Sequence, residues 1–394
     1  MEKIRAQGQT QAQSQHLSYF KVFPSQNLSE IRDALKTTLY VPEPRLKPKI
    51  ISEHLKYLEM KFELEEYPIT AFIATDANNR VCGMVICQVD PHYSSYSRKC
   101  GTFGWLHADS LAICERLMHE CAQFVRYHKV RKLRGPINCP KSLGGLGHQV
   151  EGFEEPMLYS VAYDDPDSKV LHYLVHLGYL KESQYSCVRV EKKTWDNGKQ
   201  VSKDIRLGYT DLEGIIALKD EILNLGKNSF HSILPDASGR DERFNEFVNA
   251  YAQIPEKTRR LPSDFDFRDY STNPHFVEAW ENADLSKIEM YAPMAFDRYT
   301  DELVGILFTL PDLFEVWLGN PLTRNNVDTA MVRKDYTGRG IFSALNNIGQ
   351  LTCRFYGIEY FEGTTIWSNN SRAIETIFPH CSPIRKHYMF QKRI

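Results

Sequence analysis

The sequence lacks the long apolar run that a membrane-spanning helix requires, because no stretch approaches roughly 18 apolar residues. Its first 15 residues are polar and rich in glutamine, and they lack the apolar core of a signal peptide. These absences argue against membrane insertion and against secretion. We expect residues 1–15 to form a disordered tail, and we expect the protein to be cytoplasmic.

Paired cysteines and net charge are also missing. The 9 cysteines are an odd number, and no C-x-x-C pair or Cys/His cluster has the spacing of a zinc site. The 48 basic and 50 acidic side chains leave a formal charge of −2, which gives no global field to attract DNA or an anionic membrane. We therefore expect no metal, no DNA partner and no membrane partner, and any anionic ligand must be held locally.

What is present is a globular composition on a long chain. Hydrophobic residues make up 42% and charged residues 25% of 394 residues, a length at which a single core usually stops growing. A polar segment at 192–203 contains Asp196-Asn197-Gly198, a turn-forming cluster that favours a boundary. We predict a tail at 1–15, one domain at 16–195 and a second at 196–394.

The pattern of the first half predicts two hairpin strands followed by a strand, a long helix and another strand. β-rich runs at 71–75 and 81–89 flank a turn, and apolar residues at helical spacing continue from 110 to about 128. The prediction for this half also includes a strand at 19–23, a helix at 29–39 that is ended by prolines, and strands at 103–107 and 132–135. The glycine-rich segment 142–147 is expected to be a flexible loop.

The second half predicts the same order of elements. Helices are expected at 212–225 and 242–250, followed by a hairpin of 288–296 and 303–310. A strand at 329–333, a helix at 341–356, a strand at 360–367 and a short helix from residue 371 follow. No repeat is visible at the level of individual residues, so the two halves share only the order of their predicted helices and strands.

The turn between the strand at 329–333 and the helix at 341–356 carries a candidate phosphate site. The first N–H groups of a helix have no partner within the helix, and together with the helix dipole they attract anions. Thr337-Gly338-Arg339-Gly340 places two glycines and a basic side chain at this point. An ordinary glycine-containing loop remains the alternative when the motif is taken alone.

The order of elements around this turn resembles the GCN5-related N-acetyltransferase (GNAT) superfamily. Its acetyl-CoA signature is Q/R-x-x-G-x-G/A, and it places Thr337, Gly340 and Phe342 at the three defined positions. A shifted register instead matches both Gly338 and Gly340 but lacks the Gln or Arg. Asn370 and Ala373 fit the Asn-x-x-Ala-like element that follows in the family.

Further segments narrow the resemblance to tandem GNAT-type proteins, and the likeness spans most of residues 50–394. They are 134–138, 144–147, 150–157, 177–179, 310–313 and 336–341. The resemblance implies an α+β fold of two tandem GNAT-like domains, each a mixed, mostly antiparallel twisted sheet flanked by helices.

The resemblance also implies acetyl-CoA or another acyl-CoA as co-substrate in the second domain. The implied cofactor-binding residues are Met331, Val332, Arg333, Thr337, Gly338, Arg339, Gly340, Ile341, Phe342, Ser343, Asn370 and Ala373. The tyrosine that protonates the leaving thiolate in the family is absent from its usual place, so Tyr388 is the candidate acid. Glu362 is a candidate base, and Glu359, His380 and His387 are the other candidates for that role. A half-buried aromatic is the structural alternative for the tyrosine, and a solvated surface group is the alternative for each candidate base.

The first half is expected not to bind CoA. Its strand runs through Ala108-Asp109 directly into the helix, and a carboxylate at a helix start repels phosphate. The leading hypothesis is therefore an N-acyltransferase acting on a small-molecule or peptide amine. A transferase that takes its acyl group from a carrier protein or an aminoacyl-tRNA, and a non-catalytic ligand-binding or regulatory protein, are the alternatives. The acceptor and the oligomeric state stay open. Phe314, Trp317 and Trp367 are candidates for an apolar pocket near the predicted site.

Overall fold

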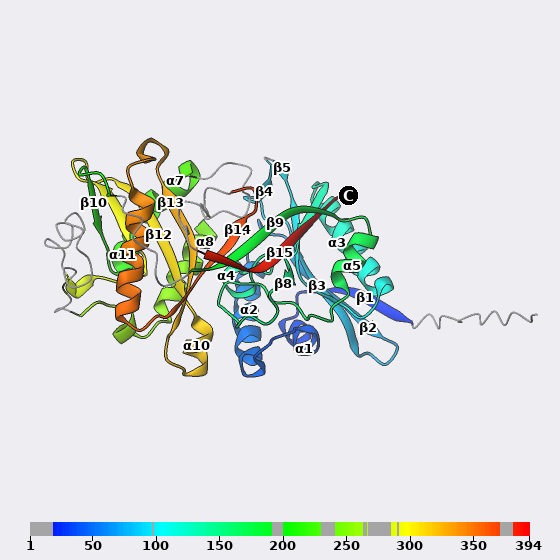
Figure 1. Ribbon diagram of the computed structural model, residues 1–394. Coiled ribbons are helices and arrows are strands. Elements are labelled where there is room, and N and C mark those ends of the chain that lie inside the picture. Colours follow the sequence, from blue (N-terminus) through cyan, green and yellow to red (C-terminus); the bar gives the residue numbers. More distant parts are fainter. Residues whose placement is uncertain are drawn as a thin grey trace, which may run out of the picture.

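The computed structural model describes residues 19–96, 98–190, 200–229, 241–262, 266, 285–289, 291–370 and 381–394. Within these ranges one continuous 13-stranded sheet runs through the molecule (Figure 1). Its main path has the order β1 (Phe20–Ser25), β2 (Ile69–Asp76), β3 (Val81–Gln88), β6 (Gly101–Ala108), β7 (Lys132–Gly135), β15 (Cys381–Arg393), β9 (Leu180–Val190), β14 (Tyr360–Trp367), β13 (Arg324–Val332), β12 (Leu303–Pro311), β11 (Met294–Asp297) and β10 (Ile205–Gly208). The strand β8 (His148–Glu151) pairs with β15, while β4 (Ser94–Ser95) and β5 (Arg98–Lys99) form a separate small hairpin.

Helices cover both faces of this sheet. In the first half they are α1 (Leu28–Thr38), α2 (Lys47–Phe62), α3 (Leu111–Tyr127), α4 (Lys141–Gly144) and α5 (Val170–His176). In the second half they are α6 (Leu212–Ala217), α7 (Lys219–Ser229), α8 (Asp241–Ala252), α10 (Leu313–Leu318) and α11 (Ile341–Phe355). Among the described residues, every helix is too short or too polar to cross a lipid bilayer.

Alternating side chains of the first-half strands enter two different cores. Phe72 and Ala74 of β2 pack with α3, whereas Ala71 and Ile73 pack with α1 and α2. Because successive side chains of a strand point to opposite faces, a strand buried on both faces is apolar at nearly every position. The first half is therefore a layer of sheet between two layers of helix.

The sheet is continuous because the last strand returns to the first half. The long strands β9 and β15 pair antiparallel over most of their length, and β15 also pairs with β7. Figure 1 shows β15, in red, lying with the green β9 where the two halves meet. The last strand of the chain and a strand from its middle thus form the centre of the sheet, a pairing that local sequence patterns did not predict.

Most predicted elements are present, and the strands 132–135 and 360–367 have the predicted bounds. Local patterns did not predict the helices α2, α5 and α10 or the strands β8, β9 and β10. The strand predicted to start at residue 288 begins at Met294, as β11. The predicted helix at 212–225 is divided between α6 and α7. The predicted tail and the short helix from residue 371 fall outside the described residues.

The prediction of a flexible loop at 142–147 is wrong. These residues are buried, and a Cβ added to Gly145 would lie 2.0 Å from the backbone nitrogen of Ala162. The glycines of this segment therefore permit close packing of backbone against backbone and do not serve flexibility.

Candidate functional site

The turn that precedes α11 has the backbone geometry that its glycines predicted. Gly338 and Gly340 adopt φ angles of +87° and +77°, in the left-handed region of backbone conformation that residues other than glycine rarely adopt. Gly340 is the N-cap of α11, a 15-residue helix, and as a glycine it has no side chain with which to cap the helix. The side-chain oxygen that accepts from the first N–H groups of most helices is therefore missing at this N-cap position.

The two glycines face different surroundings. A Cβ added to Gly340 would lie 2.5 Å from the carbonyl oxygen of Gln200, so the backbone before β10 packs against this side of the turn. The N–H of Ser202 donates to the Arg339 carbonyl oxygen at 3.0 Å and holds the two segments together. Around Gly338 no atom of the described residues lies within 4 Å of an added Cβ, and this side of the turn is open with respect to them.

The basic side chains at the turn already have acidic partners. Arg339 forms an ion pair with Asp204, whose pKa is lowered by a hydrogen bond from Ser202 and by this guanidinium. Arg333 lies 2.9 Å from carboxylate oxygens of both Glu302 and Asp335. A phosphate at this turn would meet backbone donors first, and it would reach Arg339 only by displacing Asp204.

The remaining residues predicted to bind the cofactor lie around the same turn, with two exceptions. Met331, Val332, Ile341 and Ser343 are buried, and Phe342 is half-buried against the core of the second half. Thr337 is exposed. Asn370 follows the carboxyl end of β14, which lies toward the same edge of the sheet as the turn because β14 runs parallel to β13; its N–H donates to the Trp367 carbonyl oxygen at 2.8 Å. Ala373 falls outside the described residues.

The structure does not bring Tyr388 or Glu362 to this turn. Glu362 is fully buried in an ion pair with Arg385, at 2.9 Å between Oε1 and Nε, so the expected solvated position is wrong. Tyr388 lies on β15 in register with Gln184 of β9, and Lys181 approaches its ring centroid to 4.1 Å. Two strands, β9 and β14, separate β15 from β13.

The strand that leads to the turn parts from its parallel neighbour before reaching it. β13 pairs with β14 only from Arg324 to Val327, and the register with β12 slips at Asp328, which forms a bulge. The buried Asp328 carboxylate accepts a hydrogen bond from Arg243 at 2.6 Å and from Ser160 at 3.2 Å. Burial by itself would raise the pKa of Asp328, but the positive charges of Arg243 and Lys141 outweigh burial and lower this pKa, so the group is a fixed anion between the halves.

The first half has no equivalent of the glycine turn. Ser110 caps α3, since its Oγ accepts a hydrogen bond from the Ile113 N–H, and Asp109 pairs with His107 at 2.9 Å. The side-chain cap and the adjacent carboxylate occupy the place where an anion would bind.

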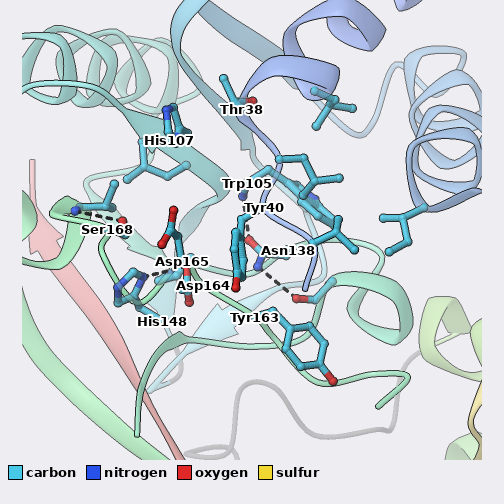
Figure 2. A pocket seen from close by; sticks show the side chains of 18 of the residues that line it. Thr38, Tyr40, Trp105, His107, Asn138, His148, Tyr163, Asp164, Asp165 and Ser168 are labelled. Carbon is cyan, nitrogen blue, oxygen red and sulfur yellow. Dashed lines mark hydrogen bonds and ion pairs between the residues drawn. The ribbon is translucent and has the colours of Figure 1, made fainter. Parts of the chain in front are cut away.

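Instead, the first half contains a pocket that the sequence analysis did not find (Figure 2). It has an empty volume of about 890 Å³, part of which is open to solvent. The segment after α1, the end of β6 and the loop before α5 supply most of its wall, and Phe314 from α10 reaches it from the second half. The acidic run from Asp164 to Asp167 was the only local signal for this site, and it gave no indication of the partners that enclose it.

No protein-family model matches the chain, and no curated protein matches it. Solved structures do. A tandem GNAT protein from the clavulanic acid biosynthesis pathway aligns over 95% of this chain and 98% of its own, with a TM-score of 0.53 and 11% identity. A GCN5-related glucosamine N-acetyltransferase region of a fungal multi-domain GH3 β-N-acetylglucosaminidase aligns over 95% of this chain but 38% of its own, with a TM-score of 0.54 and 11% identity.

A third structure is a conserved protein of unknown function from Enterococcus faecalis V583, described as a probable N-acyltransferase. It aligns over 96% of this chain and 73% of its own, with a TM-score of 0.50 and 8% identity. At such identities the likeness concerns the fold. The path of the sheet, the strand, turn and helix in the second half, and these alignments agree: the chain has an α+β fold of the tandem GNAT type.

Proposed function

We propose that the protein is an acyl-CoA-dependent N-acyltransferase whose donor binds at the turn formed by residues 337–343. The observation that carries the proposal is the pair of left-handed glycines, Gly338 and Gly340, between β13 and an uncapped α11. Backbone N–H groups at such a position bind a pyrophosphate without help from side chains. The fold shared with structures described as acetyltransferases supports the same class of reaction.

The backbone of β13 offers a donor for the thioester carbonyl. The Arg333 N–H donates to Val304 of β12 at 2.9 Å, and hydrogen-bonding directions alternate along a strand. The Val332 N–H therefore points away from β12, toward the gap that opens where β14 has separated. A donor fixed at that point would stabilise the oxyanion that forms when an amine attacks the thioester.

The reaction proposed for this site balances without a further reagent. The amine nitrogen forms a bond to the acyl carbon, the carbon–sulfur bond breaks, and the proton lost by nitrogen ends on the thiolate of CoA. Orientation of the two reactants and polarisation of the carbonyl supply most of such a rate enhancement. The acceptor is an amine, either a small molecule or a peptide.

A matched pair of substitutions at Gly338 tests the donor site. Any side chain at the left-handed φ of Gly338 is strained, but Asp and Asn tolerate this backbone better than most residues and carry the same strain, so the two variants form a matched pair. Gly338→Asp places a carboxylate against the incoming phosphates, whereas Gly338→Asn adds nearly the same shape without charge. By isothermal titration with acetyl-CoA, we expect Gly338→Asp to weaken binding at least about tenfold more than Gly338→Asn.

Absence of binding by acetyl-CoA and by longer acyl-CoAs to the wild-type protein would contradict the proposal. One observation favours a second candidate, a ligand-binding protein without catalysis: neither Glu362 nor Tyr388 lies at the turn. Binding of acyl-CoA without transfer to any of a panel of amines, followed by mass spectrometry, would favour that candidate.

A further inference from the structure

A β-bulge shapes one wall of the first-half pocket. His107 pairs with Met84 and Gly104 with Ile86, so one residue of β3 faces two residues of β6 between them. Trp105 takes the strained backbone angle that this requires, with φ at +51°, and its N–H donates to the Asn138 side chain at 2.7 Å. Three consecutive residues of β6, from Trp105 to His107, consequently line the pocket, where a regular strand would present alternate residues.

Apart from tyrosine, the ionisable groups of the pocket are carboxylates and imidazoles, and no lysine or arginine of the described residues belongs to its lining. Asp164 is already engaged, because its carboxylate contacts His148 at 3.0 Å and accepts the Gln149 N–H at 2.7 Å. Asp165 is exposed, and its carboxylate accepts only the N–H of Asp167, at 2.9 Å. Within the described ranges, no basic side chain lies at ion-pair distance from Asp165.

Aromatic side chains line the same pocket as this carboxylate. Tyr40, in the segment after α1, is 39% exposed, and Figure 2 shows it among the lining residues together with Asp165. The Trp105 indole is fixed in place by two contacts. Its Nε1 donates to the Cys139 carbonyl oxygen at 2.9 Å, and its ring centroid lies 4.6 Å from that of His54. A carboxylate next to fixed aromatic rings is complementary to a cation that carries a flat apolar body.

We propose that this pocket binds an organic monoamine, with its ammonium group paired to Asp165 and its apolar body against Tyr40 and Trp105. The ligand class follows from the lining: the carboxylate selects a positive charge, and the rings select a planar group. The site does not depend on the donor turn of the second half, and its binding is measurable with no acyl-CoA present. A failure of one proposal therefore leaves the other intact.

The test uses the full chain and three indole probes of similar size but different charge. They are the cation tryptamine, the neutral alcohol tryptophol and the anion indole-3-propionate. We expect tryptamine to bind with a dissociation constant below about 1 mM, roughly tenfold tighter than tryptophol, and indole-3-propionate not to bind detectably. Isothermal titration or saturation-transfer NMR provides the measurement.

Two neighbouring aspartates provide the matched variants. Asp165→Asn removes the charge but keeps the Oδ1 atom that accepts the Asp167 N–H, whereas Asp167→Asn removes the same charge outside the pocket lining. We expect Asp165→Asn to reduce the preference for tryptamine over tryptophol to nearly one, and Asp167→Asn to leave it unchanged. Tyr40→Ala should weaken both probes several-fold, because it removes a ring that both share.

Three results would overturn the inference. One is equal binding of tryptamine and tryptophol to the wild-type protein, or binding of neither. Another is an equal effect of Asp165→Asn and Asp167→Asn, which would indicate a diffuse field around the acidic loop and no specific pair. The third is unchanged affinity for both probes in Tyr40→Ala, which would place the indole outside this pocket.

Discussion

Arg385 of β15 and Glu362 of β14 form an ion pair that is entirely closed to solvent, and the strand β9 runs between them. The carboxylate accepts from Nε at 2.9 Å and from Nη2 at 3.3 Å, and both side chains have 0% exposure. The same guanidinium also donates to the backbone carbonyl of Pro156. The pair therefore connects the returning C-terminal strand, the second-half strand β14 and a loop of the first half.

This pair predicts a structural role for Glu362. Removing one partner of a buried ion pair leaves the other charge without compensation, so Glu362→Gln should destabilise the protein by about 3 kcal/mol in urea unfolding. Glu359 is exposed and directly precedes the same strand, so Glu359→Gln should change the free energy of unfolding by no more than about 0.5 kcal/mol. Unchanged stability of Glu362→Gln together with loss of acyl transfer would instead support the catalytic base considered from the sequence.

Removal of the last strand should destroy the first half as well as the second. Residues 381–394 include β15, which lies between β7 and β9 in the middle of the sheet. A truncated chain would leave two unpaired edges and an open core, so we expect loss of cooperative thermal unfolding and a strong tendency to aggregate. Removal of residues 1–15, which the sequence predicts to be disordered, is the control and should not alter the melting temperature. A soluble, cooperatively folded truncation would contradict the role assigned to β15.

Acidification should destabilise the protein through two buried histidines. Burial disfavours the imidazolium and lowers the pKa of His54 to about 3 and that of His387 to about 4. An unfolded histidine titrates near pH 6.5, so between pH 7 and pH 5 protons bind the unfolded chain and not the folded one. Each residue should therefore cost about 2 kcal/mol of stability over this interval.

His148 opposes this trend. Burial disfavours its charged form, but Asp164 outweighs burial and raises its pKa. Urea midpoints at pH 7 and pH 5 provide the measurement. His54→Phe should reduce the loss on acidification, whereas His172→Gln, at an exposed position, should not. An equal loss in His54→Phe and the wild type would refute the assignment of acid sensitivity to His54.

The ion pair between Asp204 and Arg339 should limit the affinity of the proposed donor site. Asp204→Asn releases the guanidinium and removes a negative charge beside the turn, so we expect acetyl-CoA to bind several-fold more tightly. Asp301→Asn makes the same change in net charge at a carboxylate that pairs with Arg206 and not with Arg339. An equal effect of both substitutions, or weaker binding in Asp204→Asn, would argue against a phosphate at Arg339.

The elements that sequence periodicity predicted are those in which local pattern and tertiary packing agree. The helix α3 and the strand β14 have strong patterns because one face or both faces meet a core. The helix α2 was not predicted. It carries Pro48 in its first turn, where proline is compatible with the start of a helix, whereas in the sequence the prolines up to Pro48 indicated only the end of the preceding helix. The pocket was missed because its wall joins Tyr40, Trp105 and Asp165, which are far apart in the chain.

The sequence by itself determined the class of fold, the order of elements in each half, and the contrast between a glycine turn in the second half and Asp109 in the first. These features depend on backbone propensity and on periodicity within short segments, which a sequence displays directly. Only the tertiary structure decided that β15 returns to the first half, that Glu362 and Arg339 are held by partners, and that Asp165 faces an aromatic pocket. Each of these depends on long-range pairing, and the identity of a residue does not state which distant charge or strand it will meet.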